Sequence, residues 1–95
     1  MRLDRSKFRA WLKTKQPDEI VGEQRTCHGC PITNFYLETT GGQEIITFER
    51  WGDYYIDRGY DKRRMPTWAE NFVVAVDDEK NPKITAARAL EILTA

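Results

Sequence analysis

Apolar residues recur at helical spacing in several segments of the chain. Phe8, Trp11 and Leu12 follow an i, i+3, i+4 pattern, which places them on one face of a helix. Trp68, Phe72, Val73 and Val76 form a similar stripe, and so do Ala86, Ala89, Leu90 and Leu93. A further short segment begins at Pro31 and contains Phe35, Tyr36 and Leu37. The pattern predicts four short helices, over residues 4–16, 31–39, 67–77 and 86–94.

Capping residues mark the ends of these helices. Asp4 or Ser6 can cap the first helix, and Pro17 ends it. Thr67 and Glu70 have the spacing of a capping box at the start of the third helix. Thr85 can cap the last helix. These signals fix the predicted helix boundaries.

Two runs of β-forming residues, 45–51 and 54–57, flank the pair Gly52-Asp53. A two-residue connection of this kind predicts a hairpin over residues 44–57. Residues 19–22 are a candidate third strand, and residues 58–65 are predicted to form a loop with a basic tip. We therefore expect an α+β fold in which about four short helices pack on a small two- to three-stranded antiparallel sheet centred on the 44–57 hairpin.

Composition limits the class of protein. A chain of 95 residues has the size of one domain, here residues 1–95. No apolar run is long enough to cross a membrane, and residues 1–16 do not have the pattern of a signal peptide. Two cysteines at Cys-x-x-Cys spacing make a poor disulfide framework, which indicates a reducing, cytoplasmic setting.

Charge is segregated along the chain although it cancels overall. Fifteen basic and fifteen acidic residues give a formal net charge of zero. Residues 1–16 and 58–64 are nevertheless basic, whereas residues 17–57 are acidic. The molecule is therefore expected to be dipolar if these blocks stay apart in the fold.

Cys27, His28 and Cys30 form the most unusual chemical cluster, directly before Pro31. Cys30 falls at the predicted N-cap of the second helix, where the helix dipole would favour a thiolate. One interpretation is a thiol-redox pair, and a second is a metal site formed by Cys27, His28 and Cys30. The third interpretation, which we favour, is structural, with Cys30 as a small buried residue at the start of the helix.

The chain contains no nucleotide-binding, hydrolase or metalloprotease motif. We therefore expect a non-enzymatic protein-binding module without a cofactor. Interface centres favour Tyr, Trp and Arg. The candidate protein-binding residues are Trp51, Tyr54, Tyr55, Tyr60, Arg63 and Arg64.

Nucleic-acid binding is the alternative function. Arg5, Arg9 and Lys13 recur every fourth residue and align on one face of the first helix. Basic groups beside aromatic rings can hold a single strand by charge and stacking. The candidate nucleic-acid-binding residues are Arg5, Arg9, Lys13, Arg58, Lys62, Arg63 and Arg64.

Residues 8–37 resemble a type of small bacterial or phage-borne hypothetical protein. The resemblance is carried by Phe8-x-x-Trp11-Leu12, Pro17-Asp18-x-Ile20-Val21-Gly22, Cys30-Pro31-Ile32 and Leu37. It brings no activity with it and implies only a bacterial or phage cytosolic setting. In that setting we expect a protein that modulates or inhibits a larger host protein.

Overall fold

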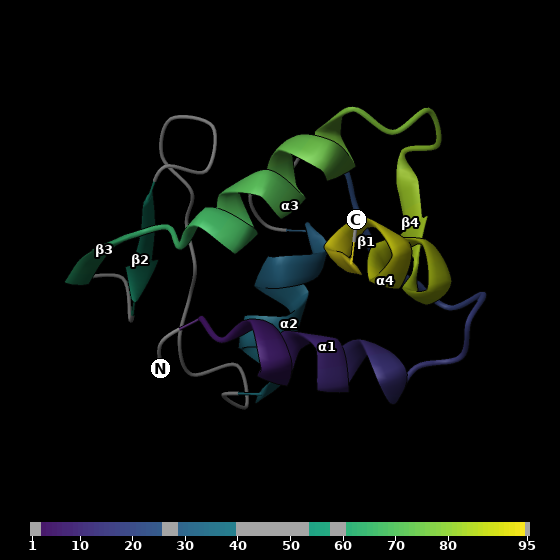
Figure 1. The fold of residues 1–95 in the computed structure, drawn as a ribbon, viewed down its shortest axis with the longest axis horizontal. Coiled ribbons are helices and arrows are strands. Elements are labelled where there is room, and N and C mark those ends of the chain that lie inside the picture. Colours follow the sequence, from purple (N-terminus) through teal and green to yellow (C-terminus); the bar gives the residue numbers. More distant parts are fainter. Residues whose placement is uncertain (1–2, 26–28, 40–53, 58–60, 95) are drawn as a thin grey trace.

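The four predicted helices all form, and they pack around one core in a computed structural model that describes residues 3–25, 29–39, 54–57 and 61–94 (Figure 1). For residues 54–57 and 61–64 the description covers the backbone. The helices are α1 (Arg5–Lys13), α2 (Pro31–Thr39), α3 (Thr67–Asp77) and α4 (Ala86–Thr94). The prediction of an α+β fold with four helices is confirmed.

Most of the helix ends follow the capping residues seen in the sequence. Asp4 caps α1, because its Oδ1 accepts a hydrogen bond of 3.0 Å from the Lys7 backbone N–H. Thr85 caps α4 in the same way, with a bond of 3.2 Å from the Arg88 N–H to its Oγ1. The predicted capping box at Thr67 is wrong. Pro66 occupies the N-cap position of α3, and no side chain there accepts a bond from the helix.

The first helix is shorter than predicted. It ends at Lys13, and Thr14 follows as its C-cap residue. The Thr14 hydroxyl donates a hydrogen bond of 2.6 Å to the Trp11 carbonyl, and the Thr14 N–H donates to the same oxygen. These bonds satisfy a carbonyl at the end of the helix. The chain therefore turns away before Pro17, the residue that the sequence predicts as the end of the helix.

Two separate two-stranded antiparallel sheets form in the described chain. One pairs β1 (Ile20–Glu23) with β4 (Lys83–Thr85), and the other pairs β2 (Tyr54–Asp57) with β3 (Asp61–Arg64). The prediction that residues 19–22 add a third strand to the hairpin sheet is wrong, because β1 pairs with β4 instead. The prediction of a loop over residues 58–65 is also wrong for residues 61–64, which form β3. The part of the predicted hairpin before Tyr54, residues 44–53, lies outside the described residues.

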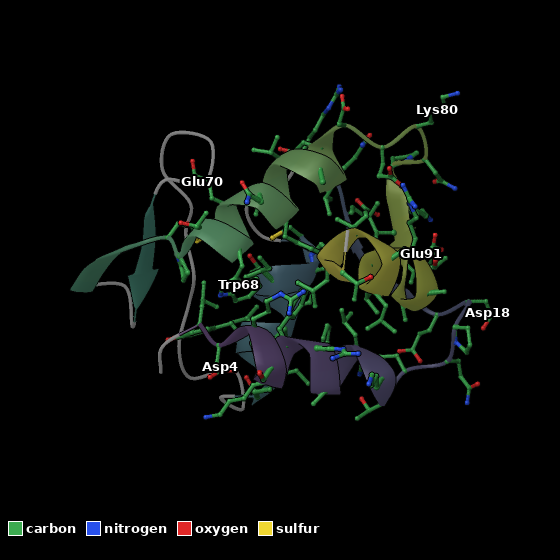
Figure 2. The ribbon with its side chains drawn as sticks, in the orientation of Figure 1. Asp4, Asp18, Trp68, Glu70, Lys80 and Glu91 are labelled. Carbon is green, nitrogen blue, oxygen red and sulfur yellow. The ribbon has the colours of Figure 1, made fainter. Side chains whose placement is uncertain are left out.

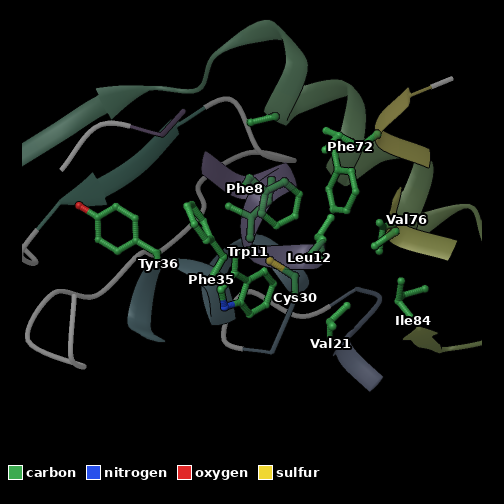
Figure 3. Packing of buried hydrophobic residues seen from close by; sticks show 14 of the residues in the cluster. Phe8, Trp11, Leu12, Val21, Cys30, Phe35, Tyr36, Phe72, Val76 and Ile84 are labelled. Atoms are coloured by element: carbon green, nitrogen blue, oxygen red, sulfur yellow. The ribbon is translucent and has the colours of Figure 1, made fainter. Parts of the chain in front are cut away.

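Aromatic rings from three helices fill the centre of the core (Figure 3). Phe8 of α1 is fully buried, and its ring lies 5.3 Å from Phe35 of α2 between centroids. On its other side it lies 5.7 Å from Trp68 and 5.0 Å from Phe72, both of α3. Trp68 lies between α3 and α1, whereas Asp18 and Lys80 lie at the edge of the molecule (Figure 2). Phe8 therefore joins α1, α2 and α3.

A hydrogen-bonded turn after β1 fastens the C-terminal end of α3. Gln24 Nε2 donates to the carbonyls of Val76 at 3.1 Å and Glu79 at 2.7 Å. The Arg25 N–H donates to Asp77 Oδ1 at 2.7 Å. The Gln24 bonds reach carbonyls at and just beyond the end of α3, and the Arg25 bond reaches the Asp77 carboxylate. The turn therefore holds the β1 side of the molecule against α3.

The hairpin of β2 and β3 lies at one end of the molecule, beside the N-terminal end of α3 (Figure 1). The β1–β4 sheet lies toward the opposite end, next to α4. Met65 connects β3 to α3 and is buried in the core. In the described part of the chain, no helix combines the length and the apolar character that a membrane crossing needs.

Candidate binding sites

The β2–β3 ladder brings together four of the six residues predicted to bind a protein. Tyr54 pairs with Arg64 and Tyr55 pairs with Arg63, so each tyrosine lies directly opposite an arginine. Residues opposite each other in an antiparallel ladder have Cβ atoms about 4.5–5.5 Å apart. The sequence named these residues as candidates. It did not place them opposite one another, because it assigned residues 61–64 to a loop.

The register divides the hairpin residues between two faces. Alternate residues of a strand belong to the same face, and opposite residues share it. One face therefore carries Tyr54, Ile56, Lys62 and Arg64, with a formal charge of +2. The other carries Tyr55, Asp57, Asp61 and Arg63, with a formal charge of −1. The two faces differ in charge, although each has one tyrosine and one of the two paired arginines.

The other candidates on this part of the chain, Trp51, Tyr60 and Arg58, lie outside the described residues. On α1, the basic residues Arg5, Arg9 and Lys13 are all exposed. Arg5 also has a structural partner, because its guanidinium donates a hydrogen bond of 2.7 Å to the Leu93 carbonyl of α4. One member of the predicted basic ridge therefore helps to hold α1 against α4.

Cys30 is buried, with 5% of its surface exposed. Its carbonyl accepts a bond of 3.0 Å from the Asn34 N–H, as expected of an N-cap residue. Its Sγ lies 3.2 Å from the Thr33 hydroxyl. Cys27 and His28 lie outside the described residues, and within those residues no three metal-ligating side chains cluster. The contacts of Cys30 support the structural interpretation of this residue.

A pocket of about 390 Å³ lies between α1, β1 and α2. Its lining includes Trp11, Lys15, Glu19, Ile20, Asn34 and Glu38, beside further apolar side chains of β1 and α2. Ile20 is 48% exposed and offers apolar surface at the pocket. The sequence does not reveal this pocket, because its charged members come from segments with no sequence motif in common.

An ion pair and an aromatic ring meet in the pocket. Lys15 Nζ lies 2.8 Å from Glu38 Oε1 and 5.0 Å from the centroid of the Trp11 ring. The Lys15 ammonium is the main reason why the pKa of Glu38 lies below its ordinary value, and desolvation opposes that effect. The indole N–H of Trp11 also favours the ionised carboxylate. This N–H acts on the carboxylate without a hydrogen bond of normal geometry. Trp11 Nε1 is buried and has no hydrogen-bond partner in the described chain.

Comparisons of this chain with protein-family models, with curated proteins and with solved structures find no match.

Proposed function

We propose that this chain is a small non-enzymatic binding protein whose β2–β3 hairpin contacts another protein. The observation that carries the proposal is the ladder register, which sets Tyr54 opposite Arg64 and Tyr55 opposite Arg63. Tyrosine and arginine are enriched among the residues that dominate binding energy at protein interfaces. A paired ladder also fixes the backbone of such residues before binding, which lowers the entropy lost on association.

The proposed partner is a larger host protein in the cytoplasm, which the chain modulates or inhibits by covering a surface. The face with Tyr54, Ile56, Lys62 and Arg64 has a formal charge of +2. An acidic surface on the partner would complement it, and such complementarity speeds association and improves specificity. We therefore expect this face, rather than the face with Tyr55 and Arg63, to make the main contact.

Two double variants test the proposal and act as controls for each other. Tyr54→Ala/Arg64→Ala removes an opposite pair from one face, and Tyr55→Ala/Arg63→Ala removes an opposite pair from the other. Both lose one tyrosine, one arginine and one positive charge. Each is used in a pull-down from host lysate, after which the captured protein is purified and its affinity for each variant is measured by titration.

We expect the Tyr54/Arg64 variant to lose at least tenfold in affinity, since one central interface residue contributes about 2 kcal/mol or more. The Tyr55/Arg63 variant should lose much less. Equal binding by the wild type and both variants would show that the hairpin is not the contact. Circular dichroism and thermal unfolding of each variant confirm that a loss of binding is not a loss of fold.

Nucleic-acid binding is a second candidate, supported by the placement of Lys62, Arg64 and Tyr54 on one face of the ladder. Positive charge beside an aromatic residue suits a single strand. A fluorescence titration with a labelled oligonucleotide at two salt concentrations tests this candidate. Phosphate contacts make affinity fall steeply as salt rises, and an absence of binding at low salt would exclude it.

A further inference from the structure

The pocket between α1, β1 and α2 contains a ready-made position for a cation. An ammonium group lies there over the face of Trp11 and against the carboxylate of Glu38, and that ammonium belongs to Lys15. Cations are attracted to the face of an indole ring and, more strongly, to a carboxylate. The contacts that Lys15 makes are the contacts that a cationic ligand would use.

The remaining polar groups of the pocket leave it negative. Lys15 and Glu38 neutralise each other, and Glu19 adds a second carboxylate to the lining. Among the residues that the structure describes, the Glu19 carboxylate accepts only a long hydrogen bond of 3.4 Å, from the Gln16 N–H. Its carboxylate therefore retains most of its capacity to accept hydrogen bonds.

The indole N–H of Trp11 favours the ionised form of Glu38, so it helps to keep the acceptor of the pocket negative. A guanidinium group has no acceptor atom, so it would use the ring face of Trp11 and not its N–H. Asn34, which also lines the pocket, donates both of its amide bonds to the carbonyls of Val21 and Gly29. Its Oδ1 is an acceptor, the type of group that a cationic ligand needs.

We propose that this pocket binds an arginine side chain of a partner protein, and that Lys15 occupies the cation position until the arginine displaces it. A guanidinium group is planar, so it stacks on an indole and forms paired hydrogen bonds with a carboxylate. Glu38 and Glu19 would accept those bonds. The exposed Ile20 beside the pocket offers apolar surface to the stem of the arginine. This site is separate from the hairpin, so the test of the site does not depend on the function proposed above.

Substitutions of Lys15 and of Glu38 are expected to change the affinity for arginine in opposite directions. If Lys15 only stabilises the fold, removing either partner should weaken any binding or leave it unchanged. If Lys15 competes with the ligand, Lys15→Met vacates the site while it keeps the apolar stem, and Glu38→Gln removes the negative charge of the acceptor. Arginine affinity should then rise in the first variant and fall in the second, each by roughly threefold to tenfold.

The probe is N-acetyl-arginine-N-methylamide, titrated into ¹⁵N-labelled protein at constant ionic strength. Its neutral isostere, N-acetyl-citrulline-N-methylamide, is titrated in parallel. The indole N–H resonance of Trp11 reports on the pocket, and the loss of one resonance in Trp11→Phe assigns it. Lys13→Met and Glu91→Gln make the same charge changes at exposed positions outside the pocket. The dispersion of each spectrum shows that the variant is folded.

We expect a saturable shift of the Trp11 resonance with the arginine compound, little shift with the citrulline compound, and wild-type behaviour in both control variants. The proposal is overturned if the arginine compound fails to shift this resonance in Lys15→Met. It is also overturned if citrulline binds as well as arginine, or if Lys15→Met and Glu38→Gln change the affinity in the same direction. Should Lys15→Met not fold, Lys15→Gln replaces it with the same expected result.

Discussion

Arg25 has a backbone conformation that residues with a side chain rarely adopt. Its φ angle is +57°, in the left-handed region where a Cβ atom is crowded by the neighbouring carbonyl. The bond from its N–H to Asp77 Oδ1, at 2.7 Å, ties this turn to the end of α3. Arg25 also donates from Nε to the Asp77 carbonyl at 3.3 Å. The contacts with α3 thus hold Arg25 in a conformation that costs energy.

A pair of substitutions at this position measures that cost. Arg25→Gly and Arg25→Ala both remove the guanidinium and keep the N–H that bonds to Asp77. Only the alanine keeps the Cβ atom, so we expect Arg25→Gly to be the more stable of the two by about 1 kcal/mol. Urea unfolding gives both free energies. An alanine variant as stable as the glycine variant would mean that the turn is not held in this conformation.

The structural role of a single residue was predictable only where its hydrogen-bond partner is near in sequence. Asp4 and Thr85 were recognised as caps because each accepts a bond from an N–H three residues later. The predicted capping box at Thr67 is wrong, because the helix begins one residue earlier than the box requires. Gln24 had no recognisable role, since the carbonyls that it satisfies belong to α3 and the turn after it.

Strand β1 and the start of α2 approach each other so closely that only glycine fits between them. A Cβ atom on Gly22 would lie 2.5 Å from the Pro31 nitrogen and 2.7 Å from the Gly29 carbonyl oxygen. Both are backbone atoms, which cannot rotate away as a side chain can. The contact sets the distance between the β1–β4 sheet and α2.

We therefore expect Gly22→Ala to destabilise the protein by about 1–3 kcal/mol, the usual cost of forcing extra volume into a packed site. Glu23→Ala is the matched control, since Glu23 is the next residue of β1 and is exposed. Thermal unfolding of both variants makes the comparison. If Gly22→Ala unfolds at the same temperature as Glu23→Ala, β1 and α2 do not lie this close.

At the scale of elements, helices were predictable and strands much less so. Each helix carries an apolar stripe of its own, so α2, α3 and α4 were predicted with nearly their observed bounds. Strand β3 consists of Asp61, Lys62, Arg63 and Arg64, and it has no apolar alternation to reveal it. Strand β4 has only three residues. Both strands exist because another segment pairs with them, which no local pattern records.

The whole molecule is organised around the ring of Phe8. It contacts its own helix neighbour Trp11, Phe35 of α2, and Trp68 and Phe72 of α3, with centroid distances of 5.0–6.0 Å. Removing a fully buried ring leaves a cavity as well as a loss of apolar burial. Three helices would lose their common contact at once.

Phe8→Ala should accordingly destabilise the protein by about 3–5 kcal/mol, a large part of the stability of a domain this size. Phe8→Leu, which keeps most of the apolar volume, should cost clearly less. Denaturant unfolding followed by tryptophan fluorescence and by circular dichroism measures both. A small loss for Phe8→Ala would contradict the central position of this ring in the core.

The sequence predicts the two candidate sites to different degrees, because it shows residue types but not contacts between distant segments. Tyrosine and arginine were recognised in the hairpin by residue type, whereas their pairing required the register. The arginine pocket was not foreseen, because Lys15 and Glu38 meet only when α1 packs on α2. The apolar stripe of the first helix predicts the burial of the Trp11 ring. It says nothing of the environment of the indole N–H.

The bond from Arg5 to the Leu93 carbonyl joins residues 88 positions apart in the chain. Bringing such distant segments together costs loop-closure entropy before the contacts they form can repay it. Proteins with many contacts of this kind refold more slowly than those whose contacts are local. We therefore expect refolding to be slower than in helical bundles of equal length, with the docking of α4 on α1 among the late events.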